Sequence, residues 1–250
     1  EVDDVIVIDD SQDDDDDDEE KASSTLPSTL TLPSFRHGGN VQLSASGVDE
    51  ATKRVLKALS STRRKGTLRA RFVDGELRTK LSSSRPPKAT HLVLPPTRAA
   101  RTLKVLFALA RGGTHIVTTD WVTASVSLDR WLDPNEFLTA FGPARPATPK
   151  LFSGATKIHI LKSSLGAGDP GHANLSALIA AAGAKTSPLR ACTYVLVGDD
   201  FRLQRASAGV KAVAKKKGGG SSKVLNVKWL LDAIEHNNPR FPTDGHVHEL

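Results

Sequence analysis

The sequence predicts an α/β fold built from two similar domains, each a small, mostly parallel four-stranded sheet flanked by helices. Residues 113–122 form a short β-branched segment that leads into a helix with Trp121 in its first turn. About a hundred residues later, segment 222–230 repeats this order, with Trp229 at the matching place. Two copies of one strand–helix unit at domain-sized spacing indicate two copies of one fold. Strands that alternate with helices favour parallel pairing, because each connection then crosses over the sheet.

The first domain is expected at residues 40–127. Its first strand alternates with a period of two, and Gly47 then turns the chain into an amphipathic helix. The strand at 89–94 ends at two prolines, and Gly112 and Gly113 end the helix that follows it. The predicted order has strands at 41–46, 68–73, 89–94 and 115–118, and helices at 49–59, at 98–111 and from Trp121.

A linker is expected at residues 128–153 and the second domain at residues 154–250. The linker combines aromatic residues with several prolines, a composition that favours a connector packed against the domains. In the second domain the strand and helix signals return in the same order, and Gly183 follows the first helix. The predicted strands are 157–161, 193–197 and 224–227, and the predicted helices are 172–182, 201–213 and one from Trp229.

The composition excludes several classes of protein. The single cysteine, Cys192, rules out an internal disulfide and a cysteine-rich zinc site. No apolar run is long enough to span a membrane, and the N-terminus lacks a signal-peptide pattern. No glycine-rich nucleotide loop, zinc-protease motif or serine-hydrolase motif occurs, so we expect no enzyme activity, cofactor or metal site. His91, His115 and His159 fall in predicted strands and are expected to be structural. The absence of methionine leads us to expect a piece of a longer protein.

Residues 1–39 form an acidic tail and linker that we expect to be disordered, because they offer too little apolar surface to offset the entropy of ordering. The first 20 residues hold 13 of the 28 acidic side chains and no Lys or Arg, which leaves 34 basic and 15 acidic residues, a net charge of +19, on the remainder. One apolar tetrad in the tail resembles a SUMO-interacting motif, which adds a strand to a sheet edge: Val5, Ile6, Val7 and Ile8. This resemblance implies SUMO or a SUMO-modified protein as a partner. A solubilising tail and an intramolecular lid over the basic body are the alternatives.

Three segments of the first domain carry a family resemblance: 89–93, 101–106 and 108–112. Together with residues 113–121 they resemble the BRCT domain, and residues 40–240 as a whole resemble a tandem BRCT pair. The first domain is similar to the phosphopeptide-binding C-terminal pair of mediator-of-DNA-damage-checkpoint proteins, whereas the second contributes mainly its spacing, Gly183 and Trp229. The resemblance implies a non-catalytic reader of phosphoserine or phosphothreonine, in a nuclear scaffold protein of the DNA-damage response or of chromosome maintenance.

The same resemblance implies a phosphate-binding site in the first domain. Ser46 and the backbone N–H of Gly47 come at the end of the first strand, and Lys104 lies on the second helix. A hydroxyl, a backbone N–H and a cation suit a phosphate dianion. The dipole of the helix at 49–59 is expected to help. Ser44, on the same face of the strand, is the alternative to Ser46.

The resemblance also implies how the rest of a peptide is bound. Arg101 precedes Lys104 by one helical turn, so both side chains reach one ligand. It matches the arginine that binds the peptide main chain, or a terminal carboxylate three residues after the phosphate. Leu106 is expected to form a wall of a pocket between the two repeats. We therefore expect specificity to be set by Arg101 and the groove between the repeats.

A different class of function stays open, namely a structural platform that binds DNA or chromatin and uses the BRCT pair for assembly. Its candidate contacts are basic: Arg63, Arg64, Lys65, Arg69, Arg71 and the lysines at 215–217. No aromatic residues are interleaved with them, so DNA binding would be non-specific and sensitive to salt. The arrangement also resembles that of some kinetochore scaffolds of the kinetoplastid type.

Overall fold

The computed structural model describes residues 41–60, 68–73, 89–96, 101–202, 207–215 and 223–240. The acidic tail with Val5, Ile6, Val7 and Ile8 lies outside these ranges, and so do the basic cluster at 63–65 and the loop at 216–222. SUMO binding and the disorder of the tail therefore stay predictions. Within the described ranges, no helix combines the length and the apolar character that a membrane span needs.

The first repeat forms a sheet of four strands with three helices. In chain order its elements are β1 (Val41–Ala45), α1 (Glu50–Leu59), β2 (Ala70–Phe72), β3 (His91–Leu94), α2 (Leu103–Arg111), β4 (His115–Thr118) and α3 (Thr119–Ser127). The strands lie in the order β2-β1-β3-β4, and every neighbouring pair is parallel. All four residues of β3 are buried, as expected of a central parallel strand with helices on both faces.

The second repeat has the same arrangement. Its elements are β5 (Lys157–Ile160), α4 (His172–Ala181), β6 (Lys185–Thr186), β7 (Tyr194–Val197), α5 (Ala208–Lys215), β8 (Lys223–Asn226) and α6 (Val227–Glu235). The strand order β6-β5-β7-β8 matches that of the first sheet, again with parallel pairs. The predicted α/β class with two four-stranded sheets is thus confirmed, and the sheets are wholly parallel.

Two predicted helices begin later than expected. Helix α2 begins at Leu103 because the Thr102 side chain caps its first turn, accepting a hydrogen bond from the Val105 N–H. The helix predicted at 201–213 is α5, which begins at Ala208. Phe201 precedes it as a buried loop residue that packs with Val210 of α5 against strands β7 and β8. Its apolar side chain anchors a loop and does not belong to a helix face.

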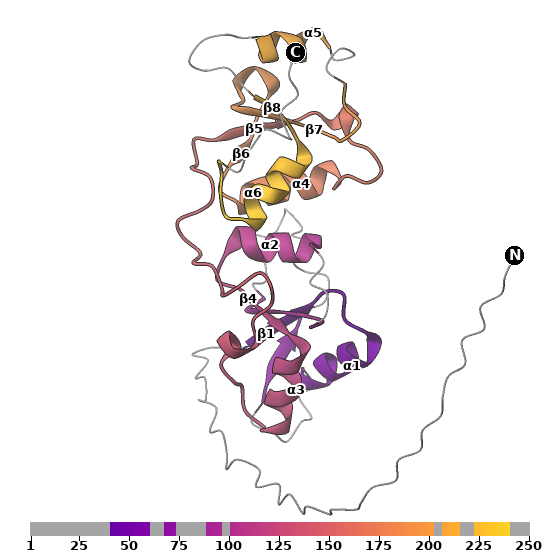
Figure 1. Ribbon diagram of the computed structural model, residues 1–250, viewed down its shortest axis with the longest axis vertical. Helices are drawn as coiled ribbons and strands as arrows, with labels where there is room; N and C mark the ends of the chain where they lie inside the picture. The colour runs from indigo at the N-terminus through magenta and orange to yellow at the C-terminus, as the bar shows by residue number, and fades with distance from the viewer. Residues whose placement is uncertain are drawn as a thin grey trace, which may run out of the picture. The chain divides into compact units, whose positions relative to one another are not determined.

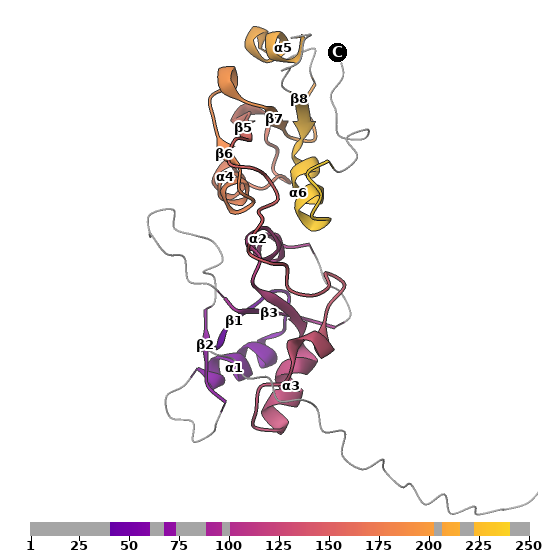
Figure 2. The same ribbon diagram turned by 90° about the vertical axis from the view of Figure 1, so that its left-hand side faces the viewer.

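Helices cover both faces of each sheet (Figure 1, Figure 2). In the first repeat α1 and α3 lie on one side and α2 on the other, and in the second repeat α4 and α6 lie opposite α5. The tryptophan that opens the last helix of each repeat is a core residue. Trp121 is 0% exposed and Trp229 is 1% exposed.

Helix α2 is buried on nearly every side. Its six residues from Val105 to Ala110 are all buried. One side packs on the first sheet, and the other packs against α4 and α6 of the second repeat. A helix that is apolar all round is typical of a position between two layers. The two repeats therefore share one core, which joins Leu106 and Phe107 to Leu178 and Ile234.

The first half of the linker is held on the surface of the first repeat. Leu132 is fully buried, and its carbonyl accepts a hydrogen bond of 3.0 Å from Trp121 Nε1. Leu138 then makes an isolated antiparallel bridge to Val117, at the free edge of β4. These contacts cover the edge strand, which would otherwise present unpaired backbone groups.

The second half of the linker packs against the end of α2. The Gly113 N–H donates to the Arg145 carbonyl at 2.6 Å. Gly112 has a φ of 67°, and a Cβ atom at this position would lie 2.2 Å from the Pro146 carbonyl oxygen. Glycine is required here both for the backbone conformation and for the close approach of the linker.

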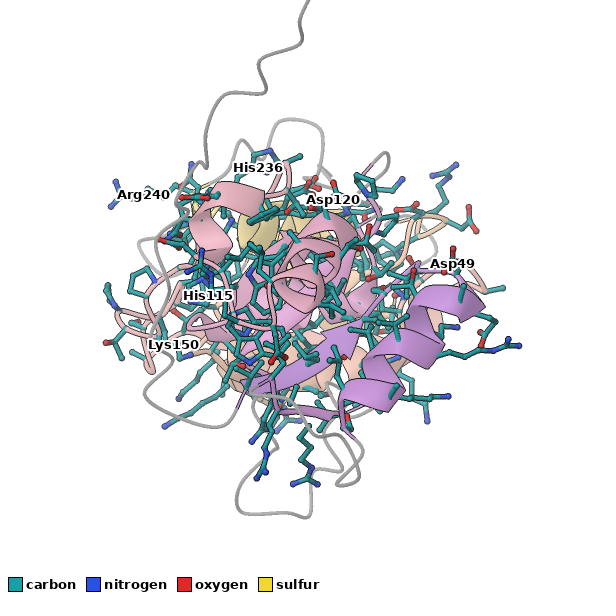
Figure 3. The ribbon with its side chains drawn as sticks, turned by 90° about the horizontal axis from the view of Figure 1, so that it is seen from below. Asp49, His115, Asp120, Lys150, His236 and Arg240 are labelled. Atoms are coloured by element: carbon teal, nitrogen blue, oxygen red, sulfur yellow. The ribbon has the colours of Figure 1, made fainter. Side chains whose placement is uncertain are left out.

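Four aromatic rings stack through the first repeat. His115 lies 5.0 Å from His91, which lies 4.5 Å from Trp121, which in turn lies 4.8 Å from Trp131, measured between ring centroids. His115 is labelled in Figure 3. Its partial burial lowers the pKa of the imidazole, an effect that the charge of Asp133 partly opposes. The stack makes these histidines part of the packing of the repeat.

Candidate functional site

The predicted phosphate-binding residues lie where β1 ends. After β1 the chain crosses to β2 on one side, whereas after β3 it crosses to β4 on the opposite side, so the direction of the connections switches between β1 and β3. Ligands of parallel α/β sheets bind at such a switch point, outside the carboxyl ends of the strands. Ser46 and Gly47 follow β1 directly, and the Ser46 N–H donates to the Val93 carbonyl at 3.1 Å. Gly47 has a φ of 71°, which turns the backbone sharply away from the sheet.

Ser46 is joined to the start of α2 through Thr102. The two hydroxyl oxygens, Ser46 Oγ and Thr102 Oγ1, lie 2.8 Å apart. Thr102 is also the N-cap of α2, so the N-terminus of this helix faces the same strand end. The helix dipole there favours an anion. Thr102 was not among the residues predicted from the sequence, although threonine directly before an apolar helix is an N-cap signal.

Lys104 brings a positive charge to the same place. Its Nζ donates to the carbonyl of Ala45, the last residue of β1, at 2.8 Å. The side chain is half-buried, so the ammonium group is held close to the strand end by the backbone. The structure thus brings Ser46, Thr102 and Lys104 together from β1 and α2.

Ser44 does not face the site. Its side chain is 0% exposed, and its hydroxyl has no hydrogen-bond partner among the described residues. Ser46 is half-exposed. Of the two serines that the sequence left open, Ser46 is therefore the one that solvent or a ligand reaches.

The structure corrects the expectation that the dipole of α1 helps to bind phosphate. Asp49 lies at the start of this helix (Figure 3). Its carboxylate caps the helix, because Oδ1 accepts a hydrogen bond of 2.7 Å from the Thr52 N–H. That backbone hydrogen bond lowers the pKa of Asp49. A negative charge already occupies the N-terminus of α1, so the favourable dipole at the site is that of α2.

Arg101 bridges the two repeats. Its Nη1 donates to the carboxylates of Asp232 and Glu235 on α6, at 2.9 Å in the case of Glu235. Burial disfavours the charge of Arg101, but the hydrogen bonds to Asp232 and Glu235 outweigh it, so the pKa lies above its usual value. Both contacts use one nitrogen of the guanidinium. Nη2 and Nε carry no hydrogen bond to any described residue, and the role of Arg101 in peptide binding stays a prediction.

Leu106 lies deeper than a groove wall would suggest. It is 2% exposed and packs within the core that the two repeats share. Leu103, one turn earlier on α2, is only partly buried against the same core. A ligand between the repeats would meet Leu103 first, and the contribution of Leu106 stays a prediction.

A second arginine, Arg145 of the linker, fixes the end of α6. Its Nη1 and Nη2 donate to the carbonyls of Ile234 and Glu235, the last residues of the helix. Burial lowers the pKa of Arg145, while the charge of Glu235 opposes this effect. An arginine donating to the last carbonyls stabilises a helix C-terminus. Sequence reasoning missed this clasp because its partners are some ninety positions away.

No metal centre accompanies the site: within the part of the chain that the structure describes, no three His, Cys, Asp or Glu side chains come together to hold a metal ion.

Some of the basic residues that were candidates for DNA binding lie within the described ranges. Arg69 and Arg71 are exposed beside and on the edge strand β2, while residues 63–65 lie outside the described ranges.

Several solved structures share this arrangement. The complex of Rtt107p with a phosphorylated histone matches with a TM-score of 0.55 and 12% identity, over 87% of this chain and 94% of that chain. A second Rtt107p structure matches with a TM-score of 0.54 and 12% identity, over 87% and 93%. The fold is that of a tandem BRCT pair. The BRCT5–BRCT6 pair of S. pombe Brc1 gives a TM-score of 0.49 at 14% identity, over 80% and 94%.

No family model matches the sequence, and no curated protein matches it. The likeness to the solved BRCT pairs therefore concerns the fold. The phosphate-binding residues have to be argued from the geometry of this chain.

Proposed function

We propose that this chain is a non-catalytic phosphopeptide-binding module, whose first BRCT repeat binds phosphoserine or phosphothreonine. The observation that carries the proposal is the meeting of Ser46, Thr102 and Lys104 at the switch point of the first sheet. Each group suits an anion, and they come from two elements that the shared core holds in place.

The chemistry fits a phosphate dianion. The Ser46 hydroxyl and the N–H of Gly47 supply donors at the end of β1, and Lys104 supplies the charge. Hydrogen bonds to ionised groups are shorter and stronger than neutral ones. The N-terminal turn of α2 adds a partial positive charge. Phosphate would compete with the carbonyl of Ala45 for the Lys104 ammonium group, a small change in a flexible side chain.

Residues downstream of the phosphorylated one would pass Arg101. The Nη2 and Nε atoms of Arg101 suit carbonyl groups of a peptide main chain, while Nη1 stays bound to α6. A downstream side chain would then lie between the repeats, near Leu103 and α6. Arg101 and this region between the repeats would set the preference for the partner.

The setting that we propose is a nuclear scaffold protein of the DNA-damage response or of chromosome maintenance, with a phosphorylated protein as its partner. A structure with this fold holds a phosphorylated histone, so the fold is compatible with a phosphorylated ligand. A platform that binds DNA or chromatin, including one at a kinetochore, is the alternative outcome of the test below.

The test is fluorescence anisotropy with a degenerate phosphoserine peptide library and its unphosphorylated twin. We expect the chain to bind only the phosphorylated library. Lys104→Gln should weaken binding by about 10- to 100-fold, the worth of one charge-assisted contact. The matched control is Lys57→Gln, which removes an exposed lysine from α1 and should leave the affinity unchanged.

Equal binding of the two libraries would refute the proposal. If the chain instead bound a labelled DNA duplex with an affinity that fell steeply with salt, the platform that binds DNA or chromatin would be the better proposal. Thermal melting of the Lys104 variant separates a lost contact from a lost fold.

A further inference from the structure

The charges at the downstream end of the proposed site are already paired. Arg101 is bound by two carboxylates, Asp232 and Glu235, whose side chains are 18% and 28% exposed. We infer that the site selects a phosphorylated residue inside a chain, and discriminates against one that lies next to a free C-terminal carboxylate. This inference rests on the proposed function and names the class of partner that the same site takes.

The geometry places downstream residues at this cluster. Arg101 lies three residues before Lys104, just ahead of the N-cap Thr102 of α2, so the chain separates the two residues by at most about 10 Å. An extended peptide advances about 3.3 Å per residue. The second or third residue after the phosphorylated one would therefore lie beside Arg101 and the end of α6.

The charged groups around Arg101 have no net positive charge that would attract a carboxylate. Arg101 is paired with Asp232 and Glu235, and Arg145 lies close to Glu235 at the same end of α6, so the four charges sum to zero. Lys228, one turn before Asp232, is paired with Asp199 at 2.6 Å. A terminal carboxylate would have to approach two carboxylates to reach an arginine that is already neutralised.

The two carboxylates are held in position. The last turn of α6 is fixed by Arg145, which donates to the carbonyls of Ile234 and Glu235. His236 closes the same turn, because its backbone N–H donates to the Asp232 carbonyl at 2.9 Å. The backbone that carries Asp232 and Glu235 is therefore fixed, which keeps both carboxylates beside Arg101.

A main-chain amide meets no such penalty. The carbonyl oxygen of a continuing peptide can accept from Nη2 or Nε of Arg101 without disturbing the ion pairs. A chain that continues past the site is therefore compatible with the paired cluster, whereas a chain that ends there is not.

The experiment compares two phosphoserine libraries that have three degenerate positions after the phosphoserine. One library ends in a free acid and the other in an amide, and each has an unphosphorylated twin. We expect the wild-type chain to bind the amide library at least about threefold more tightly at low salt, with the difference shrinking as salt screens it.

The double variant Asp232→Asn, Glu235→Gln removes both charges and keeps the shapes. Freed from its partners, Arg101 should then favour the free acid, so the preference should reverse. Asp199→Asn is the matched control, because it removes a carboxylate of the second repeat that does not contact Arg101, and it should keep the wild-type preference. If thermal melting shows that the double variant is unfolded, Glu235→Gln alone should still reduce the preference for the amide.

A wild-type preference for the free acid would overturn the inference, and so would a preference that the double variant leaves unchanged. These results differ from a failure of the proposed function. In that case neither phosphorylated library would bind better than its unphosphorylated twin, and the inference would fall with the function.

Discussion

Replacing Gly112 by alanine tests how firmly the linker holds the two repeats. Gly112 has a φ of 67° and a ψ of 173°, a conformation used almost only by glycine, and alanine would cost about 1–3 kcal/mol there. The new Cβ would lie 2.2 Å from the Pro146 oxygen and 2.9 Å from Ala147 Cα. Both are backbone atoms, so the linker must move. Its movement would break the bond from the Gly113 N–H to the Arg145 carbonyl, which costs about 1 kcal/mol more.

The expected loss for Gly112→Ala is therefore about 3 kcal/mol, which lowers the midpoint of thermal unfolding by about 6–12 °C in a chain of this size. Gly113→Ala is the matched control. Gly113 also has a positive φ, of 69°, but the nearest neighbour of a new Cβ would be the Ala147 Cβ at 3.8 Å, so alanine there is strained by its backbone without a clash. Differential scanning calorimetry of both variants measures the difference. If Gly112→Ala were no less stable than Gly113→Ala, the close approach of the linker would not be holding the structure.

Two further predictions concern the first repeat. Thr102→Val removes the hydroxyl that caps α2 and bonds to Ser46. It should cost about 1 kcal/mol of stability and weaken phosphopeptide binding severalfold, whereas Thr102→Ser should keep both near the wild-type values. A valine variant that bound phosphopeptide normally would show that Thr102 is not part of the site. For His115, burial holds the folded pKa below its usual value, so the unfolded chain takes up a proton first as the pH falls. The free energy of unfolding should thus be insensitive to this group above about pH 6.5 and decline below it. His115→Gln should flatten that decline in denaturant titrations at a series of pH values, and equal slopes for the two proteins would contradict the assignment.

Local patterns were enough to predict the elements that face the core. The strands that end in Leu94 and Thr118 and the helices that carry Trp121 and Trp229 follow from β-branched runs and apolar spacing. Strand β6 was not predicted, because two exposed residues, Lys185 and Thr186, show no alternation. Phe201 misled the helix prediction, because an apolar residue that anchors a loop looks the same in the sequence as one on a helix face.

The candidate site likewise has residues that the sequence could predict and residues that it could not. Ser46, Gly47 and Lys104 came from a motif resemblance, and the structure places them at one strand end. The partners of Arg101 could not be predicted in this way, because Asp232 and Glu235 are more than a hundred positions away and only the packing of α2 on α6 brings them close. The α1 dipole was misjudged for a local reason: the competing anion is Asp49 itself.

Helix α2 carries Lys104 in its first turn and the contact with the second repeat along its remaining length. Ligand capture and the docking of the repeats would therefore be thermodynamically linked through one rigid element. A phosphopeptide that binds only the docked arrangement would stabilise it, and by reciprocity any change that loosens the docking would lower the affinity by the same factor. Substitutions far from the phosphate, at Ile234 or Arg145, would then act as affinity variants although they touch no part of the ligand.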